Sequence, residues 1–219
     1  MALANPLMNP ALVEGVECVI FDCDGVLIDS YEANMRYYGM VREELGLPPL
    51  SDDERYFVHS RTHKAAIAHI VPEELTERAW EIIRAFDSLS LMKYLKPNDG
   101  IHEFLRWLRS AGFKLAVNTS RTDNMEMIFK EMKLDGFFFP VMTSGKVVHP
   151  KPHPEGVFEI LRVHGVAREA VAFVGDSVVD EKTARAAGVR FWAYGDDGLD
   201  AEVHINSFWD IKAVMQRVY

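Results

Sequence analysis

The chain has 219 residues, which is long enough for one core domain and a modest insertion. Of these residues 48% are hydrophobic and 26% charged, a composition typical of a globular protein. Its net charge of −9 argues against nucleic acid or an anionic membrane as partner. There is no apolar run near the roughly 20 residues of a membrane span, and Met1–Pro10 does not resemble a signal peptide. With only two cysteines, we expect a protein of the reducing cytoplasm.

The first predicted element is a buried strand at 18–21 that ends in acidic residues. Asp22 and Asp24 follow the apolar run at spacing i, i+2, and Gly25 allows the chain to turn directly after them. Residues at this spacing in an extended segment point to the same side, so both carboxylates can share one site. Neighbouring carboxylates are costly to bury unless a cation neutralises them. The segment therefore predicts a metal site, with an exposed acidic turn as the alternative.

The next part of the chain has a helical pattern and no convincing strand. Helices are expected at about 31–45, 64–70 and 72–88, followed by a return crossing at 94–97. This predicts an all-helical cap domain inserted at 31–97, between the two parts of a core domain formed by 1–30 and 98–219. An insertion that leaves from the end of a strand would lie over a site at that end.

From residue 98 onward the pattern alternates between helix and strand. Helices are predicted at 99–110 (with Asp99 as N-cap), 123–133, 154–164 and 179–187, and strands at 114–118, 137–142, 171–175 and 189–194. Such alternation predicts an α/β fold with a doubly wound, mostly parallel, Rossmann-like sheet. In these sheets ligands bind beyond the carboxyl ends of the strands.

Polar residues follow two of these strands. Thr119 and Ser120 come after the strand at 114–118, where hydroxyl groups and backbone N–H groups at a helix start suit a phosphate, although both residues could simply cap the helix. Asp176 and Asp180 come after the strand at 171–175. Asp180 also suits a helix N-terminus, where an acid is favoured.

A rigid loop adds a cation to this set. Lys151 lies among three prolines, at 150, 152 and 154, which fix the backbone and hold the lysine in place. Together these segments bring hard oxygen ligands and one lysine to the same edge of the sheet. No cluster of His and Cys converges with them, so the pattern favours Mg²⁺ over Zn²⁺.

The order of these motifs resembles that of the haloacid dehalogenase superfamily, in its helical-cap phosphatase branch. The resemblance covers most of the chain and is carried by DCDGVLIDS at 22–30, VNTS at 117–120, KPHPE at 151–155 and VGDSVVD at 174–180. Each motif alone is weak, but all four occur in the order of that family, with the helical insertion between the first two.

The resemblance implies a phosphate-transfer chemistry and assigns the roles. Asp22 would be the nucleophile that forms an aspartyl phosphate, and Asp24 the general acid that protonates the leaving oxygen and then the base that activates water. Thr119, with Ser120 beside it, and Lys151 would bind the phosphoryl oxygens.

The resemblance also implies a Mg²⁺ ion. Asp22, the backbone carbonyl of Asp24 and Asp176 would hold it, and Asp180 would support it through water or by holding Lys151. The acid at position 24 disfavours the dehalogenase and phosphonate-hydrolase branches, which lack one there.

The substrate implied is a small phosphorylated metabolite, since the overall pattern looks most like phosphoglycolate phosphatases. A β-phosphoglucomutase-like sugar mutase, a non-catalytic phosphate-binding protein and a receiver-type phosphorylation switch are the alternatives. In the insertion, Arg61 and His63 can grip a substrate carboxylate or a second phosphate, or can belong to a solvated helix start. The sequence leaves open a monomer or a small homo-oligomer.

Overall fold

The structure is a computed structural model that describes residues 9–59, 63–122 and 124–219. The chain falls into two compact units. The core unit consists of Met1–Ile28 and Pro97–Tyr219, and the helical unit consists of Asp29–Lys96. The sequence predicts the insertion at 31–97, and the division in the structure lies within two residues of that at either end.

The core unit contains a six-stranded sheet in which each strand is parallel to its neighbours. The strand order is β5-β4-β1-β6-β7-β8. The strands are β1 (Cys18–Phe21), β4 (Lys114–Asn118), β5 (Val141–Met142), β6 (Val171–Gly175), β7 (Arg190–Tyr194) and β8 (Val203–Ile205). This confirms the predicted α/β, doubly wound, Rossmann-like sheet.

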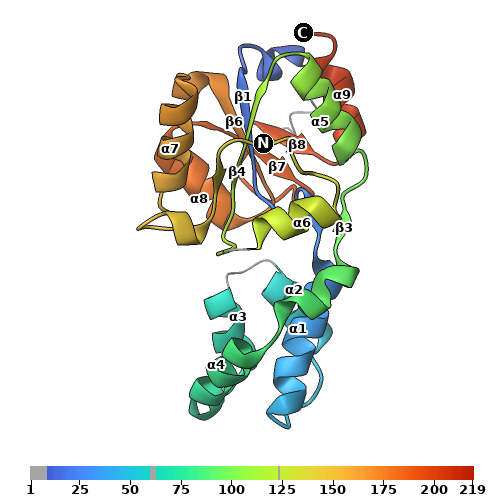
Figure 1. The fold of residues 1–219 in the computed structure, drawn as a ribbon, viewed down its shortest axis with the longest axis vertical. Helices are drawn as coiled ribbons and strands as arrows, with labels where there is room; N and C mark the ends of the chain where they lie inside the picture. The colour runs from blue at the N-terminus through green and yellow to red at the C-terminus, as the bar shows by residue number, and fades with distance from the viewer. Residues whose placement is uncertain (1–8, 60–62, 123) are drawn as a thin grey trace. The chain divides into compact units, whose positions relative to one another are not determined.

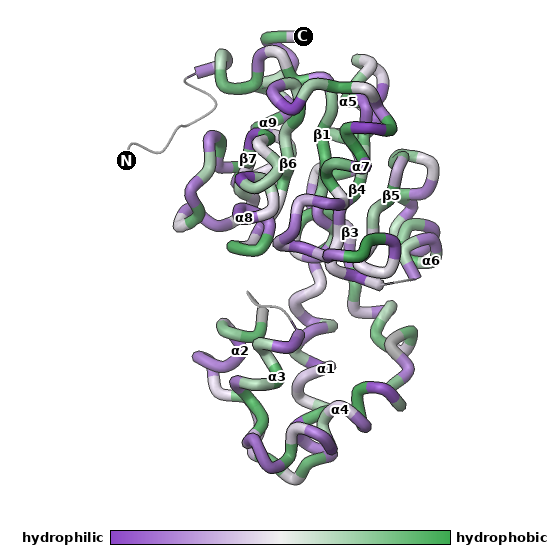
Figure 2. Tube along the Cα trace, turned by 90° about the vertical axis from the view of Figure 1, so that its left-hand side faces the viewer, coloured by the Kyte–Doolittle hydropathy of each residue, from purple (hydrophilic) through white to green (hydrophobic). Residues whose placement is uncertain are grey.

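Helices cover both faces of this sheet (Figure 1). They are α5 (Ile101–Ser110), α6 (Met125–Glu131), α7 (Glu155–His164), α8 (Val178–Ala187) and α9 (Phe208–Met215). Successive residues of β1 alternate between the faces. Ile20 belongs to a buried cluster with Val157 of α7 and Ala184 of α8, whereas the ring of Phe21 meets Phe104 of α5 edge-on at 6.3 Å. Figure 2 shows the matching hydrophobic colouring of the central strands.

The described residues of the helical unit form four α-helices around a core of their own. They are α1 (Tyr31–Glu44), α2 (Asp52–His59), α3 (His63–Ile70) and α4 (Thr76–Ala85), with 3₁₀ turns at Glu73–Leu75 and Ser88–Tyr94. Tyr38, Val41 and Ile67 are among the buried residues of that core. The segments that join the two units, β2 (Ile28–Asp29) and β3 (Lys96–Pro97), pair as a two-stranded sheet.

One arginine organises the polar contacts of the helical unit. Arg42 on α1 is buried and donates to the carbonyl oxygens of Pro48 (2.7 Å) and Ile70 (3.1 Å). Its third contact is with Glu54 on α2, whose Oε1 lies 2.7 Å from Arg42 Nη1. A single guanidinium therefore connects three of the four helices and the turn that follows α1.

Two predicted elements differ in the structure. Asp99 is not the N-cap of α5, because Gly100 takes that position with φ +76°, and Asp99 instead accepts a hydrogen bond from Trp209 Nε1 (2.9 Å). The strand predicted at 137–142 is formed only by Val141–Met142. Pro140 has no N–H to donate to a strand ladder, and Phe139 before it is 69% exposed.

The helix predicted at 72–88 is also shorter. Pro72 precedes a 3₁₀ turn rather than starting the α-helix, which runs from Thr76 to Ala85. The sequence patterns also missed α2, β8 and α9, all of eight residues or fewer. Periodicity is weakly defined over such short segments.

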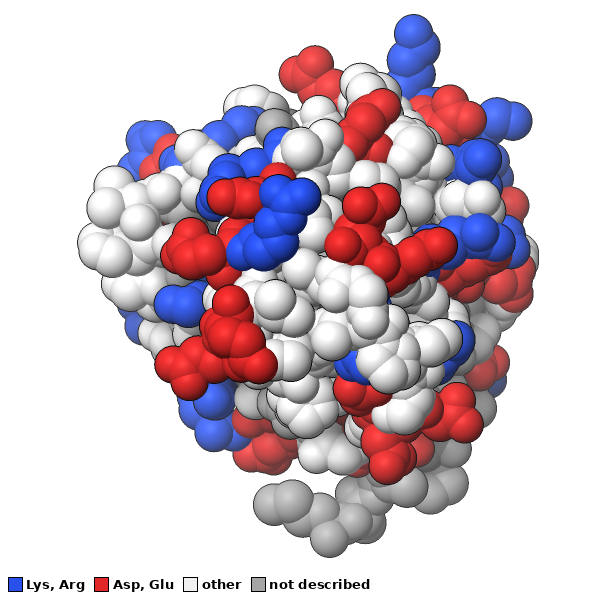
Figure 3. Space-filling view, turned by 90° about the horizontal axis from the view of Figure 1, so that it is seen from below, with Lys and Arg blue, Asp and Glu red and all other residues white. Residues whose placement is uncertain are grey.

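The described helices include none that is both long and apolar enough to cross a membrane. Figure 3 shows acidic and basic side chains interspersed over the face in view. Among the residues coloured there, the basic side chains form no continuous patch.

Candidate active site

The central strands of the sheet end at the same level, which gathers their polar residues. Phe21 of β1 lies opposite Val117 of β4 and Val174 of β6. Asp22 is the next residue, and its backbone N–H donates to the carbonyl oxygen of Val174 at 2.9 Å. The segments at 22–25, 119–121 and 176–180 therefore all leave the carboxyl edge of the sheet, where doubly wound folds place their ligands.

Lys151 lies between two of the carboxylates. Its Nζ donates to Asp22 Oδ1 at 2.8 Å and to Asp180 Oδ1 at 2.6 Å, and only 3% of its side chain is exposed. The two aspartates hold the pKa of Lys151 above its usual range even though burial opposes this. The ammonium is thus a fixed positive charge beside the Asp22 carboxylate.

The loop that carries Lys151 is stabilised by an acid at the start of α7. Glu155 accepts from the backbone N–H groups of Val148 (2.7 Å) and His149 (3.0 Å), and its Oε2 also lies 3.0 Å from His149 Nδ1. The backbone N–H of Glu155 in turn lies 3.3 Å from His153 Nδ1. These contacts, together with the prolines, shape the turn around the lysine.

Three carboxylates form the acidic part of the site. One carboxylate oxygen from each of Asp22, Asp176 and Asp180 lies within 4.8 Å of the other two. Two glycines leave room for them: a Cβ on Gly25, which has φ +76°, would lie 1.7 Å from Asp176 Oδ2, and one on Gly175 would lie 2.3 Å from the Cβ of Asp180. The carboxylates therefore occupy space that a side chain at either glycine would fill.

The charges of this group do not balance. Three carboxylates face one ammonium, and burial raises the pKa of Asp22 to about 7, with the Lys151 ammonium opposing it and Asp180 adding to it. Burial followed by repulsion from Asp180 also raises the pKa of Asp176 well above its ordinary range. A cluster of hard oxygen donors with excess negative charge fits a divalent cation such as Mg²⁺.

Asp180 is also tied to the helix that follows β6. Ser177 is the N-cap of α8, its Oγ accepts from the backbone N–H of Asp180 at 3.3 Å, and it donates to Asp180 Oδ2 at 2.6 Å. Asp180 is fully buried. It therefore lies in the first turn of the helix, where an acid is favoured, rather than at the cap position, and it also holds Lys151.

Thr119 and Ser120 differ from their predicted setting. Thr119 is buried at the end of β4, its backbone N–H donates to Met142, and its Oγ1 accepts from the N–H of Arg121 at 3.2 Å, whereas Ser120 is exposed. No helix begins directly behind them, since α6 starts at Met125. The expectation that these two residues lie at a helix N-terminus, or cap one, is therefore wrong.

Two functional candidates were missed by sequence reasoning. Arg121 binds Asp24 through both ends of the carboxylate, with Nε 2.6 Å from Oδ2 and Nη2 2.7 Å from Oδ1. Asn98 donates through Nδ2 to the carbonyl oxygens of Gly25 (2.9 Å) and Val26 (2.7 Å), and so fixes the turn after β1. The signal for Arg121 was its place directly behind the Thr-Ser pair at a strand end; nothing in the sequence marked Asn98.

Two further predicted site residues, Arg61 and His63, belong to the insertion. Arg61 lies outside the described residues. His63 begins α3 of the helical unit, is exposed, and has its ring 5.3 Å from that of Tyr37. Their suggested contact with substrate stays a prediction.

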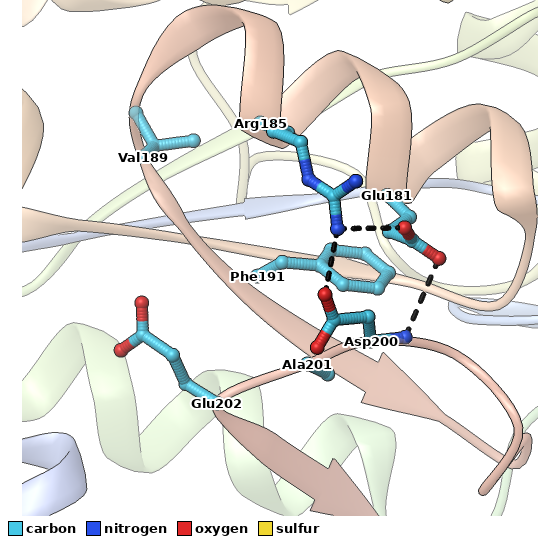
Figure 4. Close-up of a pocket in the computed structure, with 7 residues that line it drawn as sticks. All are labelled: Glu181, Arg185, Val189, Phe191, Asp200, Ala201 and Glu202. Atoms are coloured by element: carbon cyan, nitrogen blue, oxygen red, sulfur yellow. Dashed lines mark hydrogen bonds and ion pairs between the residues drawn. The ribbon is translucent and has the colours of Figure 1, made fainter.

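A separate hollow on the core unit has a different character (Figure 4). It has a volume of about 280 Å³ and is lined by Glu181, Arg185, Val189, Phe191, Asp200, Ala201 and Glu202. Its arginine is already paired with two acids, Glu181 at 3.0 Å and Asp200 at 2.7 Å. An acidic hollow of this kind is a poor receptor for a phosphate ester, whereas the strand-end cluster has a buried lysine and carboxylates that fit a divalent cation.

Comparison with known proteins agrees with this geometry. A sequence model of the family described as haloacid dehalogenase-like hydrolase matches residues 19–194. A phosphoglycolate phosphatase from Pseudomonas savastanoi is 31% identical over 182 residues, which cover 78% of this chain and 66% of that relative, just under two thirds of its length. A phosphoglycolate phosphatase from Nitrosococcus oceani is 29% identical over 220 residues and covers 92% of this chain and 97% of its own.

Solved structures show the same likeness. A HAD-superfamily hydrolase of subfamily IA from Geobacter sulfurreducens is 34% identical with a TM-score of 0.77, and the match covers 92% of this chain and 97% of that one. A putative beta-phosphoglucomutase from Thermotoga maritima has a TM-score of 0.71 over 93% of this chain and 100% of its own. At 24% identity, that second likeness concerns the fold alone.

Proposed function

This chain belongs to the haloacid dehalogenase-like hydrolase family, and from that premise we propose that it is a Mg²⁺-dependent phosphatase of small phosphate monoesters. The observation that carries the proposal is the buried group at the strand ends. Asp22 lies 2.8 Å from Lys151 and shares a cluster with Asp176 and Asp180. This arrangement provides a carboxylate nucleophile, a fixed cation and ligands for a metal ion.

In the first step a carboxylate oxygen of Asp22 attacks phosphorus, and the bond between phosphorus and the ester oxygen breaks. The leaving oxygen takes a proton from the Asp24 carboxyl group, so that an alcohol departs and Asp22 carries the phosphoryl group. Lys151 and Thr119 bind the phosphoryl oxygens during the transfer. Because this transition state is loose, most of the catalysis is positioning and charge neutralisation.

In the second step Asp24, now a carboxylate, accepts a proton from a water molecule as that water attacks phosphorus. The bond between phosphorus and Asp22 breaks, which releases inorganic phosphate and restores both side chains. In the structure both oxygens of Asp24 accept hydrogen bonds from Arg121, which is the ionised state that this second step uses. In the first step one oxygen of Asp24 carries the proton, and the other keeps its contact with Arg121. The same carboxyl group thus serves as acid and then as base.

The metal ligands in this proposal are the side chains of Asp22 and Asp176 and the backbone carbonyl of Asp24. When bound, Mg²⁺ supplies positive charge against the phosphoryl oxygens and the clustered carboxylates. Asp180 supports the site through its contact with Lys151, which stays between Asp180 and Asp22.

The printed names of the relatives favour 2-phosphoglycolate as the first substrate to try. The sugar-mutase alternative is not favoured, because the relatives named are phosphatases and the likeness to a mutase structure concerns the fold alone. We also propose that the helical unit acts as a cap and carries Arg61 and His63 as substrate contacts.

The test is phosphate release from a panel of phosphate esters, with and without Mg²⁺, for the wild type and Asp22→Asn. Release that needs Mg²⁺ and is lost by at least about 10³-fold in Asp22→Asn supports the proposal. The control is Asp53→Asn on α2, an exposed acid of the helical unit, which is expected to keep full activity.

Unchanged release by Asp22→Asn would contradict the assignment of the nucleophile. Binding of phosphate without release from any ester would instead indicate a non-catalytic binding protein. Release seen only with a bisphosphorylated sugar as primer would point to a mutase.

A further inference from the structure

Arg121 has a partly buried side chain, and the proposed reaction uses it only to hold Asp24. It follows β4, 97 residues along the chain from Asp24, and contacts both carboxylate oxygens at 2.6 and 2.7 Å. Burial lowers the pKa of Arg121, but the Asp24 carboxylate more than offsets this, so the guanidinium is charged. It therefore places a permanent positive charge on the side of Asp24.

The backbone of Arg121 is fixed from two sides. Its carbonyl oxygen accepts from the N–H of Ser144 at 2.9 Å and from Ser144 Oγ at 3.2 Å. Its own N–H donates to Thr119 Oγ1 at 3.2 Å. The guanidinium therefore extends from an anchored base, next to a residue proposed to bind phosphate.

Asp24 uses only one edge of this guanidinium. Nε and Nη2 together form the side-on edge, and both point at Asp24. Arginine has five N–H donors, so the end-on edge formed by Nη1 and the second N–H of Nη2 remains for another planar anion. The side chain of Arg121 is 29% exposed, so part of it is accessible to a ligand.

The position of Asp24 says which part of a substrate would meet this edge. A general acid must come within about 3.2 Å of the oxygen that it protonates. Both oxygens of Asp24 have a nitrogen of Arg121 within 2.7 Å. Whichever oxygen donates the proton, Arg121 lies within about 6 Å of the ester oxygen of the substrate. A carboxylate on the next carbon lies inside that range.

We propose that Arg121 determines specificity by binding a carboxylate one carbon away from the ester oxygen, while its other edge keeps Asp24 aimed at that oxygen. This inference rests on the proposed phosphatase activity and assigns to Arg121 the recognition of the carboxylate in phosphate esters of small 2-hydroxy acids. The planar fork of arginine suits two carboxylates at once, which an ammonium does not.

The experiment compares two esters of similar size, 2-phosphoglycolate and ethyl phosphate, of which only the first has a carboxylate. For Arg121→Gln we expect kcat/KM to fall for both esters, because Asp24 is less well oriented. The fall is expected to be a further tenfold to about 100-fold larger for 2-phosphoglycolate, through the lost charge-assisted hydrogen bonds. Arg121→Lys keeps the charge but not the planar fork. Its kcat/KM values are expected to lie between those of the wild type and those of Arg121→Gln.

A second readout uses binding of the products rather than a comparison of substrates. The inhibition constant of glycolate, the carboxylate product, is expected to rise at least about tenfold in Arg121→Gln, while that of inorganic phosphate stays within about twofold. The control is Arg106→Gln on α5, where an exposed arginine is paired with Glu103. This variant makes the same change in charge. It is expected to change neither the relative kcat/KM of the two esters nor the relative inhibition constants of glycolate and phosphate.

Equal losses for both esters, together with an unchanged inhibition constant for glycolate, would overturn the inference and leave Arg121 as a positioning residue for Asp24. That result is distinct from failure of the proposed function, in which the wild type would release phosphate from neither ester. Circular dichroism of each variant separates a folding defect from these outcomes, and Arg121→Lys is the second variant if Arg121→Gln does not fold.

Discussion

Each of the two units buries a small group of charged side chains, but the charges balance in only one of them. In the helical unit, Arg42 meets Glu54 and two backbone carbonyl oxygens, so one cation faces one anion. In the core unit, Lys151 faces Asp22 and Asp180, and Asp176 belongs to the same cluster. One cation there faces three anions.

The difference separates a structural ion pair from the cluster proposed as the active site. A balanced pair with its hydrogen bonds satisfied is complete without a ligand, and its removal shows up as lost stability. Excess buried negative charge is costly in the folded protein and is tolerated where a cation or substrate offsets it. Charge balance in the buried groups therefore distinguishes the two units without reference to any relative.

Among the substitutions that compare the two units, the largest effect is expected from adding one methyl group at Gly25 in the core unit. Gly25 and Gly46 both have positive φ, +76° and +68°, but only at Gly25 would a Cβ meet a neighbour, Asp176 Oδ2, at 1.7 Å. Gly25→Ala is expected to displace this carboxylate and lower kcat by at least about 100-fold, since catalysis is sensitive to displacements of this size. The stabilisation of the protein by Mg²⁺ against urea is expected to fall with it.

Gly46→Ala is the matched control in the helical unit. It carries the same backbone strain, about 1 kcal/mol, with nothing within 4 Å of the added methyl group. We expect normal kcat and a normal response to Mg²⁺. Equal kinetic effects of the two substitutions would remove the claim that the turn at Gly25 is fitted to a carboxylate.

The next effect is expected in the helical unit. Arg42→Met leaves the Glu54 carboxylate and the carbonyl oxygens of Pro48 and Ile70 without this donor. We expect the free energy of unfolding to fall by about 2–3 kcal/mol, below the range for fully buried pairs because Glu54 is 24% exposed. Urea denaturation, with hydrogen exchange to localise the loss to residues 29–96, measures it.

The free energy of unfolding is expected to fall less in Arg42→Lys than in Arg42→Met, because an ammonium keeps the positive charge. It still falls, because an ammonium cannot reach the three acceptors as the guanidinium fork does. Arg78→Met on α4 removes an arginine whose side chain is 64% exposed and serves as control. If Arg42→Met were no more destabilising than Arg78→Met, the buried pair would contribute nothing to the helical unit.

The fold was predictable where a segment combined a long apolar run with a clear end. The strands at 114–118 and 171–175 have the predicted bounds, because each is an almost wholly buried run that stops at polar residues. The strand predicted at 137–142 is shorter in the structure. Much of the apolar content behind that prediction came from Phe137–Phe139, and Phe139 is exposed. Apolar character alone does not say whether a side chain is buried.

The site was predictable as far as sequence order could place it. Asp22 and Lys151 were singled out from a strand end and a rigid loop, and the structure brings them into contact. The pairing of Arg121 with Asp24 was not predicted, because no prolines mark the position of Arg121 as they mark that of Lys151. Asn98 was missed for a different reason, since its partners are backbone carbonyl oxygens, which no residue type in the sequence identifies.

The smallest expected effect is the response of the helical unit to acid. The backbone N–H of Ser51 (2.7 Å from Glu54 Oε2) and the Arg42 guanidinium hold the pKa of Glu54 below its ordinary value of 4.5. A carboxyl group whose pKa is lower in the folded state stabilises the protein above its unfolded pKa, and this contribution is lost as the pH falls through the folded pKa. The urea midpoint of the wild type is therefore expected to fall more steeply between about pH 5 and pH 3 than that of Glu54→Gln.

Glu77→Gln, an exposed acid on α4, is the control and is expected to follow the wild type. A wild-type slope matched by Glu54→Gln would mean that the pair with Arg42 does not depend on the charge of Glu54. Arg42 would then stabilise the helical unit through its contacts with Pro48 and Ile70. Its contribution would come from hydrogen bonds to the backbone rather than from the ion pair with Glu54.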